Sequence, residues 1–443
     1  MIIPAGRTYR QIGPSQFERG LFSLTKIAGL VARPLILLFF LRNGNATLAH
    51  DFSLLLTATA SSFIILNNQN YRVVYQYFLD DRRSSLSHGL GGRDIFESYI
   101  VGTLIHIVFF IWIAAAVLWF WIDRIDLFLI ATVLIVIEKY FDDDQRVLVY
   151  QRRYYQWIAN FTLRIIFPSF VLICAVLVTN VSRADSYVAA AAIGMVIYIL
   201  HYRKKFVRVS LKCLKRELKR GIASATHHYF VSYKNEFLIA QFWAFLAANA
   251  IIVDRFFVNL AHPQIFSEYI FAVNVANTVQ TFHNLGYVSF RRPALMNTGT
   301  SAIKAEFALT NWLLPLGLTL CILTVHFGAD ALGFTLSRLD TSLILAISLL
   351  YLIHAVSLVA KEIAFWRLKR GVLLTQELVV FIFPVATYLL GVTDTLAIVL
   401  STCVGVIARL GLLVWLTHLA QAPDSTLRLS SAVRNGAQRK QPF

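Results

Sequence analysis

The stretch KIAGLVARPLILLFFL, residues 26–41, is apolar enough for a lipid bilayer except for two cations and a proline. Lys26 and Arg33 are seven residues apart, which places them on nearly the same face of a helix. Pro34 removes a backbone hydrogen bond beside Arg33. An ionised side chain at membrane depth costs on the order of 3 kcal/mol, so it normally faces protein or a water-filled cavity. The stretch therefore predicts a membrane-spanning helix with one polar face turned away from lipid.

The rest of the chain shares this apolar character. Of its 443 residues, 57% are hydrophobic and only 15% are charged. So few charges cannot cover a soluble protein of this size, which indicates a polytopic membrane protein. Apolar runs of roughly 20 residues, long enough to cross the hydrocarbon core, recur along the sequence. They predict an all-α protein with about 12 transmembrane helices, centred near residues 31, 58, 110, 131, 167, 193, 241, 276, 316, 349, 383 and 407.

The net charge of +17 is unevenly distributed. The most basic segment is HYRKKFVRVSLKCLKRELKRG, residues 201–221, and every second connection, such as the one that begins at Lys361, is also basic. The alternate connections hold at most one cation each, namely Arg42, Arg124, Arg183, Arg255 and Arg338. This asymmetry follows the positive-inside rule and predicts that both termini are cytoplasmic. Because topology explains the charge, we expect no nucleic-acid partner.

The sequence also contains an internal repeat. FFLRNGNATLAHDF (39–52) aligns without gaps to FFVNLAHPQIFSEY (256–269), so that Phe39 matches Phe256. Arg153 with Pro168 and Lys369 with Pro384 repeat a spacing of fifteen residues after almost the same interval. We call the interval from Pro168 to Pro384 the repeat offset, and it is close to half the length of the chain.

The repeat predicts two six-helix lobes related as parallel repeats. We expect an N-terminal lobe at 1–200, a basic cytoplasmic linker at 201–226, a C-terminal lobe at 227–420 and a basic cytoplasmic tail at 421–443. Each lobe would keep the same orientation in the membrane, because six spans is an even number.

Three features resemble the multidrug/oligosaccharidyl-lipid/polysaccharide (MOP) exporter superfamily. They are a first helix containing GLVARPLILLFFLRNGNA (29–46), a second helix that opens on an acid-aromatic pair, and the segment VDRFFVNLAHPQIFSEYIFAVNVANTV (253–279). Within that superfamily the chain looks most like the polysaccharide (Wzx-like) flippases. The resemblance implies V-shaped lobes around a central cavity and alternating access, without covalent chemistry.

The substrate implied by the resemblance is an undecaprenyl-diphosphate-linked oligosaccharide. Such a protein would move it across the bacterial inner membrane for the synthesis of O-antigen, capsule or exopolysaccharide. The implied partners are the lipid-linked oligosaccharide, membrane lipids and the polymerase and chain-length proteins of the same pathway. We therefore expect a transporter that is not an enzyme, with no catalytic residues.

The candidate diphosphate ligands are basic side chains at predicted membrane depth, namely Arg33, Arg164, Arg72 and Lys26. Guanidinium groups bind phosphate oxygens in paired, charge-assisted hydrogen bonds. Arg33 lies near the middle of its span, and Arg164 lies four residues before Pro168, so neither can easily extend to the interface. Lys26 could extend there instead of facing a cavity, as could Arg409, and Arg72 is either interfacial or cavity-lining.

The two predicted lobes differ in their internal charges. The first is cationic with little internal acid, whereas the second pairs Lys234 with Glu236 and Asp254 with Arg255. Val380 occupies the repeat position of Arg164, so the architecture does not require that cation. The acidic run FDDDQR (141–146) falls in a predicted cytoplasmic connection, where we expect a solvated helix end. No cysteine or histidine spacing suggests a metal site.

Polar side chains in the predicted spans supply the remaining candidates. Four asparagines could bind sugar hydroxyls or form hydrogen bonds between helices, namely Asn67, Asn70, Asn274 and Asn277. Three acids could carry a coupling proton or sodium ion, namely Asp254, Glu236 and Asp51. No other cofactor is expected.

Three other functions remain open from the sequence. A drug or cation exporter of the same superfamily would need acids in its cavity, and the first lobe is predicted to be cationic. A membrane polysaccharide polymerase or ligase would typically have a long outer loop, and the outer connections are no longer than about fifteen residues. A structural scaffold would not explain arginines at membrane depth.

Overall fold

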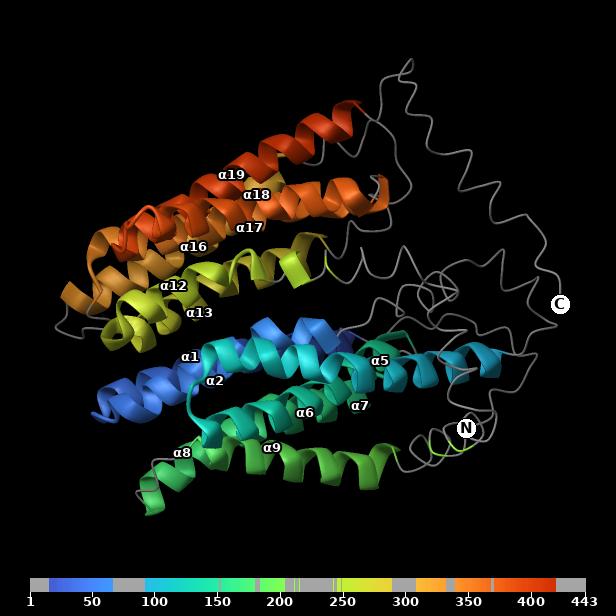
Figure 1. Ribbon diagram of the computed structural model, residues 1–443. Coiled ribbons are helices and arrows are strands. Elements are labelled where there is room, and N and C mark those ends of the chain that lie inside the picture. Colours follow the sequence, from blue (N-terminus) through green and yellow to red (C-terminus); the bar gives the residue numbers. More distant parts are fainter. Residues whose placement is uncertain are drawn as a thin grey trace. The chain divides into compact units, whose positions relative to one another are not determined.

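The computed structural model describes residues 16–66, 92–150, 153–179, 184–203, 211, 215, 242, 245–247, 249–288, 308–331, 339–367 and 370–419. Within these ranges the secondary structure is helical, and no strand occurs (Figure 1). The prediction of an all-α protein is confirmed for this part of the chain. Eleven of the twelve predicted span centres lie in described helices, and the one near residue 241 lies outside the described residues.

The chain divides into two compact units. Unit 1 comprises Met1–Val275 with Ser337–Leu339, and unit 2 comprises Ala276–Leu336 with Asp340–Phe443. The predicted linker at 201–226 lies largely outside the described residues, and the predicted tail at 421–443 lies wholly outside them. The boundaries of the two predicted lobes therefore stay a prediction.

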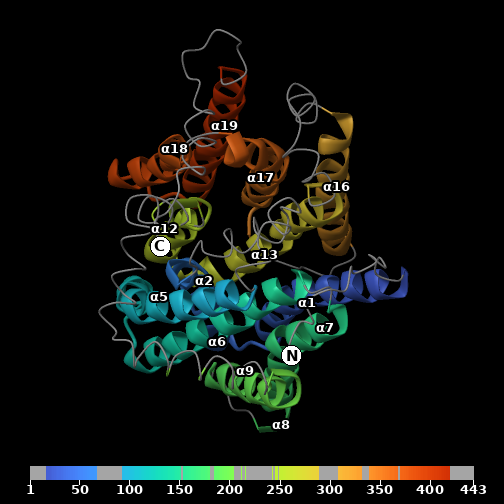
Figure 2. The same ribbon diagram turned by 90° about the vertical axis from the view of Figure 1, so that its right-hand side faces the viewer.

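Unit 1 is a bundle of helices around α2 and α6. α2 packs against α5 and α6, α8 packs along α9, and α1 packs against α7 (Figures 1 and 2). The elements described in this unit are α1 (Gln16–Arg42), α2 (Ala46–Leu66), α5 (Gly92–Trp121), α6 (Ile125–Tyr150), α7 (Tyr154–Phe161), η2 (Thr162–Ile166), α8 (Phe167–Thr179), α9 (Asp185–Tyr198), η3 (Ile199–Arg203), α12 (Val253–Ala261) and η4 (Pro263–Ile265).

Unit 2 is built on α19, along which both α17 and α18 pack (Figure 1). α13 (Phe266–His283) begins in unit 1 and ends in unit 2. The other elements described in unit 2 are η5 (Asn284–Val288), α16 (Leu309–Ala331), α17 (Thr341–Arg367), α18 (Arg370–Leu389) and α19 (Thr395–Leu419).

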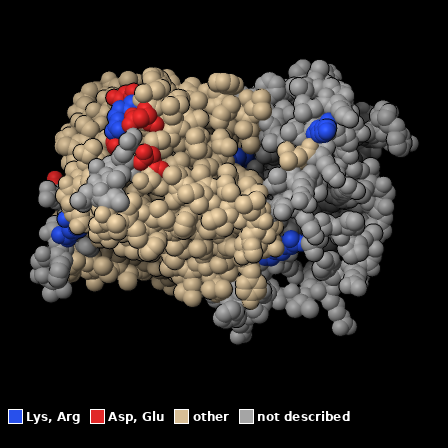
Figure 3. All heavy atoms as spheres, turned by 90° about the horizontal axis from the view of Figure 1, so that it is seen from below, with Lys and Arg blue, Asp and Glu red and all other residues tan. Residues whose placement is uncertain are grey.

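Five described helical segments are long and apolar enough to cross a membrane. They are Tyr155–Val178, Asp185–Tyr202, Leu309–Ala329, Thr341–Ala364 and Thr395–Leu416. The described surface in Figure 3 fits this finding, because acidic and basic side chains are absent from most of it. These features indicate a helical membrane protein, as the sequence predicts.

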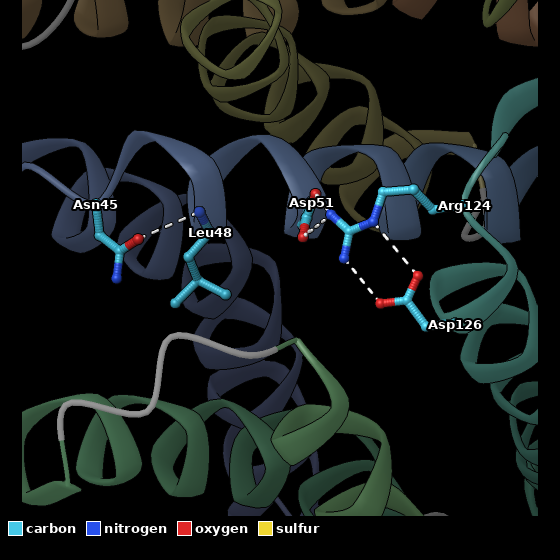
Figure 4. Close-up of polar contacts among 5 residues, drawn as sticks. All are labelled: Asn45, Leu48, Asp51, Arg124 and Asp126. Atoms are coloured by element: carbon cyan, nitrogen blue, oxygen red, sulfur yellow. Dashed lines mark hydrogen bonds and ion pairs between the residues drawn. The ribbon is translucent and has the colours of Figure 1, made fainter.

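Short polar contacts fix the connections at one end of unit 1. Gly44 has a φ of +70°, a left-handed conformation that suits glycine at the end of α1. Asn45 directly precedes α2 and caps it, because its Oδ1 accepts the Leu48 amide at 3.2 Å (Figure 4). Further along α2, Asp51 accepts two hydrogen bonds from Arg124, which lies between α5 and α6.

A wide helical turn, η2, interrupts the helix formed by α7 and α8. The Phe167 amide donates to the Thr162 carbonyl five residues earlier, as in a π-helix. Pro168 follows directly, and it has no amide to donate to the carbonyl of Arg164 four residues before it. Gly194 lets α9 approach this turn, because an added Cβ would lie 2.6 Å from the Leu163 carbonyl oxygen. The sequence thus places Arg164 in an irregular turn beside a tightly packed helix.

Candidate functional site

A charged cluster in unit 1 brings together two of the predicted diphosphate ligands. We call it the Glu138 cluster, and it consists of Arg33, Glu138, Gln145 and Arg164. Arg33 donates from Nη2 to Glu138 Oε1 at 3.1 Å. Arg164 donates to Glu138 Oε2 through both Nε and Nη2, and to Gln145 Oε1 through Nη1 at 3.3 Å. One carboxylate therefore bridges two guanidinium groups that come from distant parts of the sequence.

Three elements position these side chains. α1 supplies Arg33, α6 supplies both Glu138 and Gln145, and η2 supplies Arg164. Glu138 and Gln145 are seven residues apart, which puts them on the same face of α6 two turns from each other. Tyr187, fully buried on α9, lies close enough to Arg33 and Glu138 to interact with both electrostatically. Arg164 itself is within the membrane-spanning segment Tyr155–Val178, so the cluster belongs to the apolar part of the unit.

The Glu138 cluster has more hydrogen-bond donors than acceptors. Arg33 Nε and Gln145 Nε2 are buried and are not satisfied by Glu138, although the buried Tyr187 hydroxyl interacts with the Arg33 guanidinium. The cluster also has a net positive charge, because two guanidinium groups share one carboxylate. The Arg33 side chain is 33% exposed, against 14% for Arg164 and 8% for Glu138. Arg33 is therefore the cation of this cluster that a ligand can reach most readily.

The prediction that the first lobe contains little internal acid is wrong. Glu138 and Asp144 are both buried in α6. Asp144 Oδ2 accepts hydrogen bonds from Asn160 Nδ2 at 3.1 Å and from the Tyr198 hydroxyl at 2.6 Å. The prediction of a solvated helix end at 141–146 is also wrong at Asp144, which is buried within α6 and binds side chains of α7 and α9.

A second charged cluster lies in unit 2. We call it the Glu377 cluster, and it consists of His354, Ser357, Lys361, Glu377 and Arg409. Glu377 is fully buried and forms ion pairs with Lys361 Nζ at 2.8 Å and Arg409 Nη1 at 3.0 Å. Arg409 Nη2 lies 2.8 Å from His354 Nδ1 and 3.1 Å from Ser357 Oγ. Since a guanidinium group can only donate, His354 must accept at Nδ1 and is therefore neutral.

The Glu377 cluster corrects two predictions. Arg409 is fully buried, so the alternative in which it extends to the membrane interface is wrong. Lys361 does not lie in a connection but inside α17, within the segment Thr341–Ala364. Both errors have one cause: the carboxylate that holds these cations comes from another helix, and such a partner cannot be identified from the local sequence.

The predicted ion-coupling acids occupy different surroundings. Asp254 is fully buried on α12, where Oδ1 accepts the Arg255 amide at 2.7 Å and Oδ2 accepts the Tyr269 hydroxyl at 2.5 Å. Asp51 binds Arg124 at 2.8 and 3.0 Å, so a coupling ion would have to displace that guanidinium. Glu236 lies outside the described residues.

Arg124, the partner of Asp51, also binds a second acid, Asp126. Arg124 donates to Asp126 Oδ1 at 3.3 Å from Nε and to Oδ2 at 2.8 Å from Nη2 (Figure 4). This hydrogen bonding lowers the pKa of Asp126 below its ordinary value, and the two acids raise the pKa of Arg124, with Asp126 contributing most. Arg124 and Asp126 are therefore both charged near neutral pH.

The other predicted ligands are only partly visible. Asn274 and Asn277 are half-buried on α13, where their roles as sugar ligands stay a prediction. The backbone of Lys26 belongs to α1, but its side chain is outside the described set. The predicted ligands that lie wholly outside the described residues are Arg72, Asn67 and Asn70.

The structure adds Glu138, Gln145 and Glu377 to the functional candidates. A signal for Glu138 was present in the sequence, because it directly follows the apolar run IATVLIVI (130–137). The predicted span ends before Glu138, so Glu138 was not considered as a residue at membrane depth. Glu377 and Gln145 have no comparable signal, since both lie in segments whose depth the sequence leaves undetermined.

The fold and these clusters define a helical membrane protein with buried ion-pair networks. Comparison of the chain with protein-family models, with curated proteins and with solved structures finds no significant match.

Proposed function

We propose that this protein is a flippase that moves an undecaprenyl-diphosphate-linked oligosaccharide across the bacterial inner membrane by alternating access. The observation that carries the proposal is the Glu138 cluster. Its two arginines meet within the apolar part of unit 1, and its donors exceed its acceptors. A diphosphate supplies several anionic oxygens, which suit paired guanidinium groups. Arg33 and Arg164 would hold the headgroup, with Lys26 and Arg72 as further proposed ligands.

The positions of the described helices support two lobes related as parallel repeats. The repeat offset that separates Pro168 from Pro384 also separates the start of α6 at Ile125 from the start of α17 at Thr341. Duplicated six-helix lobes would require equal intervals of this kind.

Two glycines show a similar close helix approach in each unit, although the interval between them is not the repeat offset. Gly194 allows α9 to approach the Leu163 backbone, and Gly405 allows α19 to approach the Val380 backbone. An added Cβ would meet the opposite backbone at 2.6 Å in the first case and at 3.0 Å in the second. Each proposed lobe would thus pack its last helix against the preceding one at a glycine.

Contacts within unit 1 also bear on how the proposed lobes would meet. Asn249, which belongs to the second lobe by sequence, donates to the Ser61 carbonyl at 3.2 Å. Phe256 packs edge-on against Trp121 with ring centroids 5.2 Å apart. Such contacts would join the beginning of the second lobe to α2 and α5 of the first.

The charges favour this proposal over export of drugs or cations. A cation exporter needs an acid that is free to attract its substrate. Among the described residues, Glu138 and Glu377 each bind two basic side chains, and Asp51 binds Arg124. Both buried clusters therefore keep a positive excess, which favours an anionic substrate. Coupling to a proton or sodium ion through Asp254, Glu236 or Asp51 remains part of the proposal.

The proposal predicts transport by the purified protein in proteoliposomes. Lipid-linked oligosaccharide is placed in both leaflets, and a membrane-impermeant glycosidase is then added outside. With an active flippase, nearly all of the saccharide should become accessible, whereas about half should stay protected in empty liposomes. Protection of half the saccharide in the presence of correctly folded protein and an imposed ion gradient would refute the proposed function.

A further inference from the structure

We infer that Glu138 is an internal competitor of the transported headgroup: its carboxylate occupies Arg33 and Arg164 when the site is empty, and a diphosphate must displace it in order to bind. The role of Glu138 in a transport cycle rests on the proposed function. The binding competition itself can be measured independently of transport.

The bridging geometry is the first support. Each oxygen of Glu138 binds a different arginine, Oε1 to Arg33 and Oε2 to Arg164. A phosphate group between two arginines would use the same donors in the same way, since carboxylate and phosphate oxygens accept equivalent forked hydrogen bonds. The carboxylate thus occupies the position that an anionic ligand would take.

The unused donors are the second support. A carboxylate has two oxygens, and both are already bound to arginines. Gln145 Nε2 nevertheless remains buried without a hydrogen-bond partner among the described residues, and Glu138 does not satisfy the buried Arg33 Nε. A buried donor without a partner costs roughly 1–3 kcal/mol. A diphosphate has more oxygens than a carboxylate and could satisfy the donors that Glu138 leaves unpaired.

Electrostatics makes the two anions exclusive. Glu138 is almost fully buried, with a side chain only 8% exposed, and charges interact strongly where water is scarce. A diphosphate close to both arginines would repel a carboxylate that stayed between them. Glu138 must therefore leave the arginines when the ligand binds, and it returns when the ligand departs.

Competition of this kind serves a transporter in two ways. Without Glu138, the empty site would hold the partly exposed Arg33 and the largely buried Arg164 with no counter-ion, which is unfavourable at membrane depth. A returning carboxylate also weakens the hold on the diphosphate and so allows its release on the other side. A neutral headgroup cannot compensate both arginines, so Glu138 also makes the site selective for anions.

The test measures ligand binding to the full-length protein in detergent. Glu138→Gln keeps the size of the side chain but removes its charge. The probe is farnesyl diphosphate, a short isoprenyl diphosphate, and binding is followed by calorimetry. We expect the variant to bind at least about tenfold more tightly than the wild type, since removal of the competing charge leaves both guanidinium groups to the ligand. Unchanged or weaker binding by folded protein would overturn the inference.

Two further arms define what is recognised. Inorganic diphosphate tests a free anion, and farnesol tests the isoprenyl chain without charge. Tighter binding of both diphosphates, but not of farnesol, is the expected result. A gain for farnesyl diphosphate alone would assign the site to a lipid headgroup, whereas a gain for farnesol would contradict a competition between charges.

Glu377→Gln is the matched control, because Glu377 is also buried between two cations. It should give no gain in affinity for farnesyl diphosphate, and an equal gain would show that the effect is not specific to Glu138.

Glu138→Asp keeps the charge with a shorter reach and should bind farnesyl diphosphate with an affinity between those of the wild type and Glu138→Gln. If Glu138→Gln does not fold, wild-type affinity in Glu138→Asp would overturn the inference. If Glu138→Gln binds the diphosphate more tightly but the wild-type protein moves no lipid-linked oligosaccharide, the competition stands and the proposed function is refuted. If the wild-type protein transports the lipid but Glu138→Gln binds no more tightly, the proposed function stands and the competition is refuted.

Discussion

The two charged clusters contain the same number of charges but differ in access and in origin. In each, one carboxylate binds two cations. The Glu138 cluster draws its cations from α1 and η2, and Arg33 remains one-third exposed. The Glu377 cluster draws its cations from α17 and α19, and both Glu377 and Arg409 are fully buried. The difference indicates that a buried ion pair can either prepare a binding site or hold helices together, according to whether a cation stays accessible.

The proposed duplication makes this comparison more specific. The repeat offset relates Glu138 to His354, and it also relates Gln145 to Lys361. Each of these positions takes part in the cluster of its own unit. Equivalent helical positions in the two units would thus both belong to an ion-pair network, but with side chains of different charge. We expect mutations in the two clusters to separate function from stability.

The largest effect is expected for Arg409→Ala. Its removal leaves Glu377 with one cation fewer, and breaking a buried ion pair typically costs about 3–5 kcal/mol. The variant should be depleted from the membrane, and the remaining protein should unfold at a clearly lower temperature. Ile407→Ala on the same helix, where the side chain is 52% exposed, is the control and should be nearly neutral. Normal abundance of Arg409→Ala would show that the Glu377 cluster is not structural.

Arg33→Ala should have the opposite profile. The guanidinium is partly exposed and shares Glu138 with a second arginine, so its loss should change membrane abundance little. Transport should fall at least about tenfold, because a charge-assisted hydrogen bond contributes roughly 1.5–3 kcal/mol. Arg33→Lys keeps the charge without the fork and should restore transport only in part. Full activity of Arg33→Ala at native abundance would remove Arg33 from the headgroup site.

Arg164→Ala should likewise lower transport, with a larger loss of protein from the membrane than Arg33→Ala. Arg164 binds both Glu138 and Gln145 and is less exposed than Arg33. Thermal unfolding of the two purified variants compares these effects directly. A more stable Arg164→Ala than Arg33→Ala would contradict the order of burial on which the comparison rests.

The two close helix approaches should respond unequally to alanine. Gly194→Ala places a Cβ against the Leu163 carbonyl and should cost about 1–3 kcal/mol, because the backbone has to move. Gly405→Ala has slightly more room beside Val380 and should cost less. Gly411→Ala meets nothing within 4 Å, so it should be neutral or slightly stabilising. Melting temperatures in the reverse order would argue against equivalent helix packing in the two proposed lobes.

The smallest effect is expected for Arg124→Ala, because ion pairs of exposed side chains such as Arg124 and Asp126 contribute little to stability. The folded protein keeps the pKa of Asp126 below its ordinary value. Its stabilising contribution is therefore fully present above that ordinary value and is lost only as the pH falls towards the lowered pKa. Unfolding temperatures of wild type and variant should run parallel between about pH 6 and pH 8. Divergence within that range would mean that another titrating group depends on Arg124.

The sequence predicted the positions of the helices better than the partners of their charges. Hydropathy located α17 and α19 because a membrane-spanning helix needs a long apolar run, and such a run is a local property. Arg33 and Arg164 were candidates because each lies at predicted membrane depth and close to a proline. The structure shows that both bind the carboxylate of Glu138. That carboxylate was missed because α6 continues beyond the point where its apolar run ends.

By itself, the sequence determined the helical membrane class, the helix positions and the presence of cations at depth, since each follows from the composition of a short segment. Only the tertiary structure decided which cation meets which acid. Arg409 has no acid nearby in its own helix, and its partner Glu377 is supplied by α18, 32 residues earlier. Burial of a charge depends on neighbours that folding brings together, so the division between an accessible cluster and a closed one is a property of the packed helices.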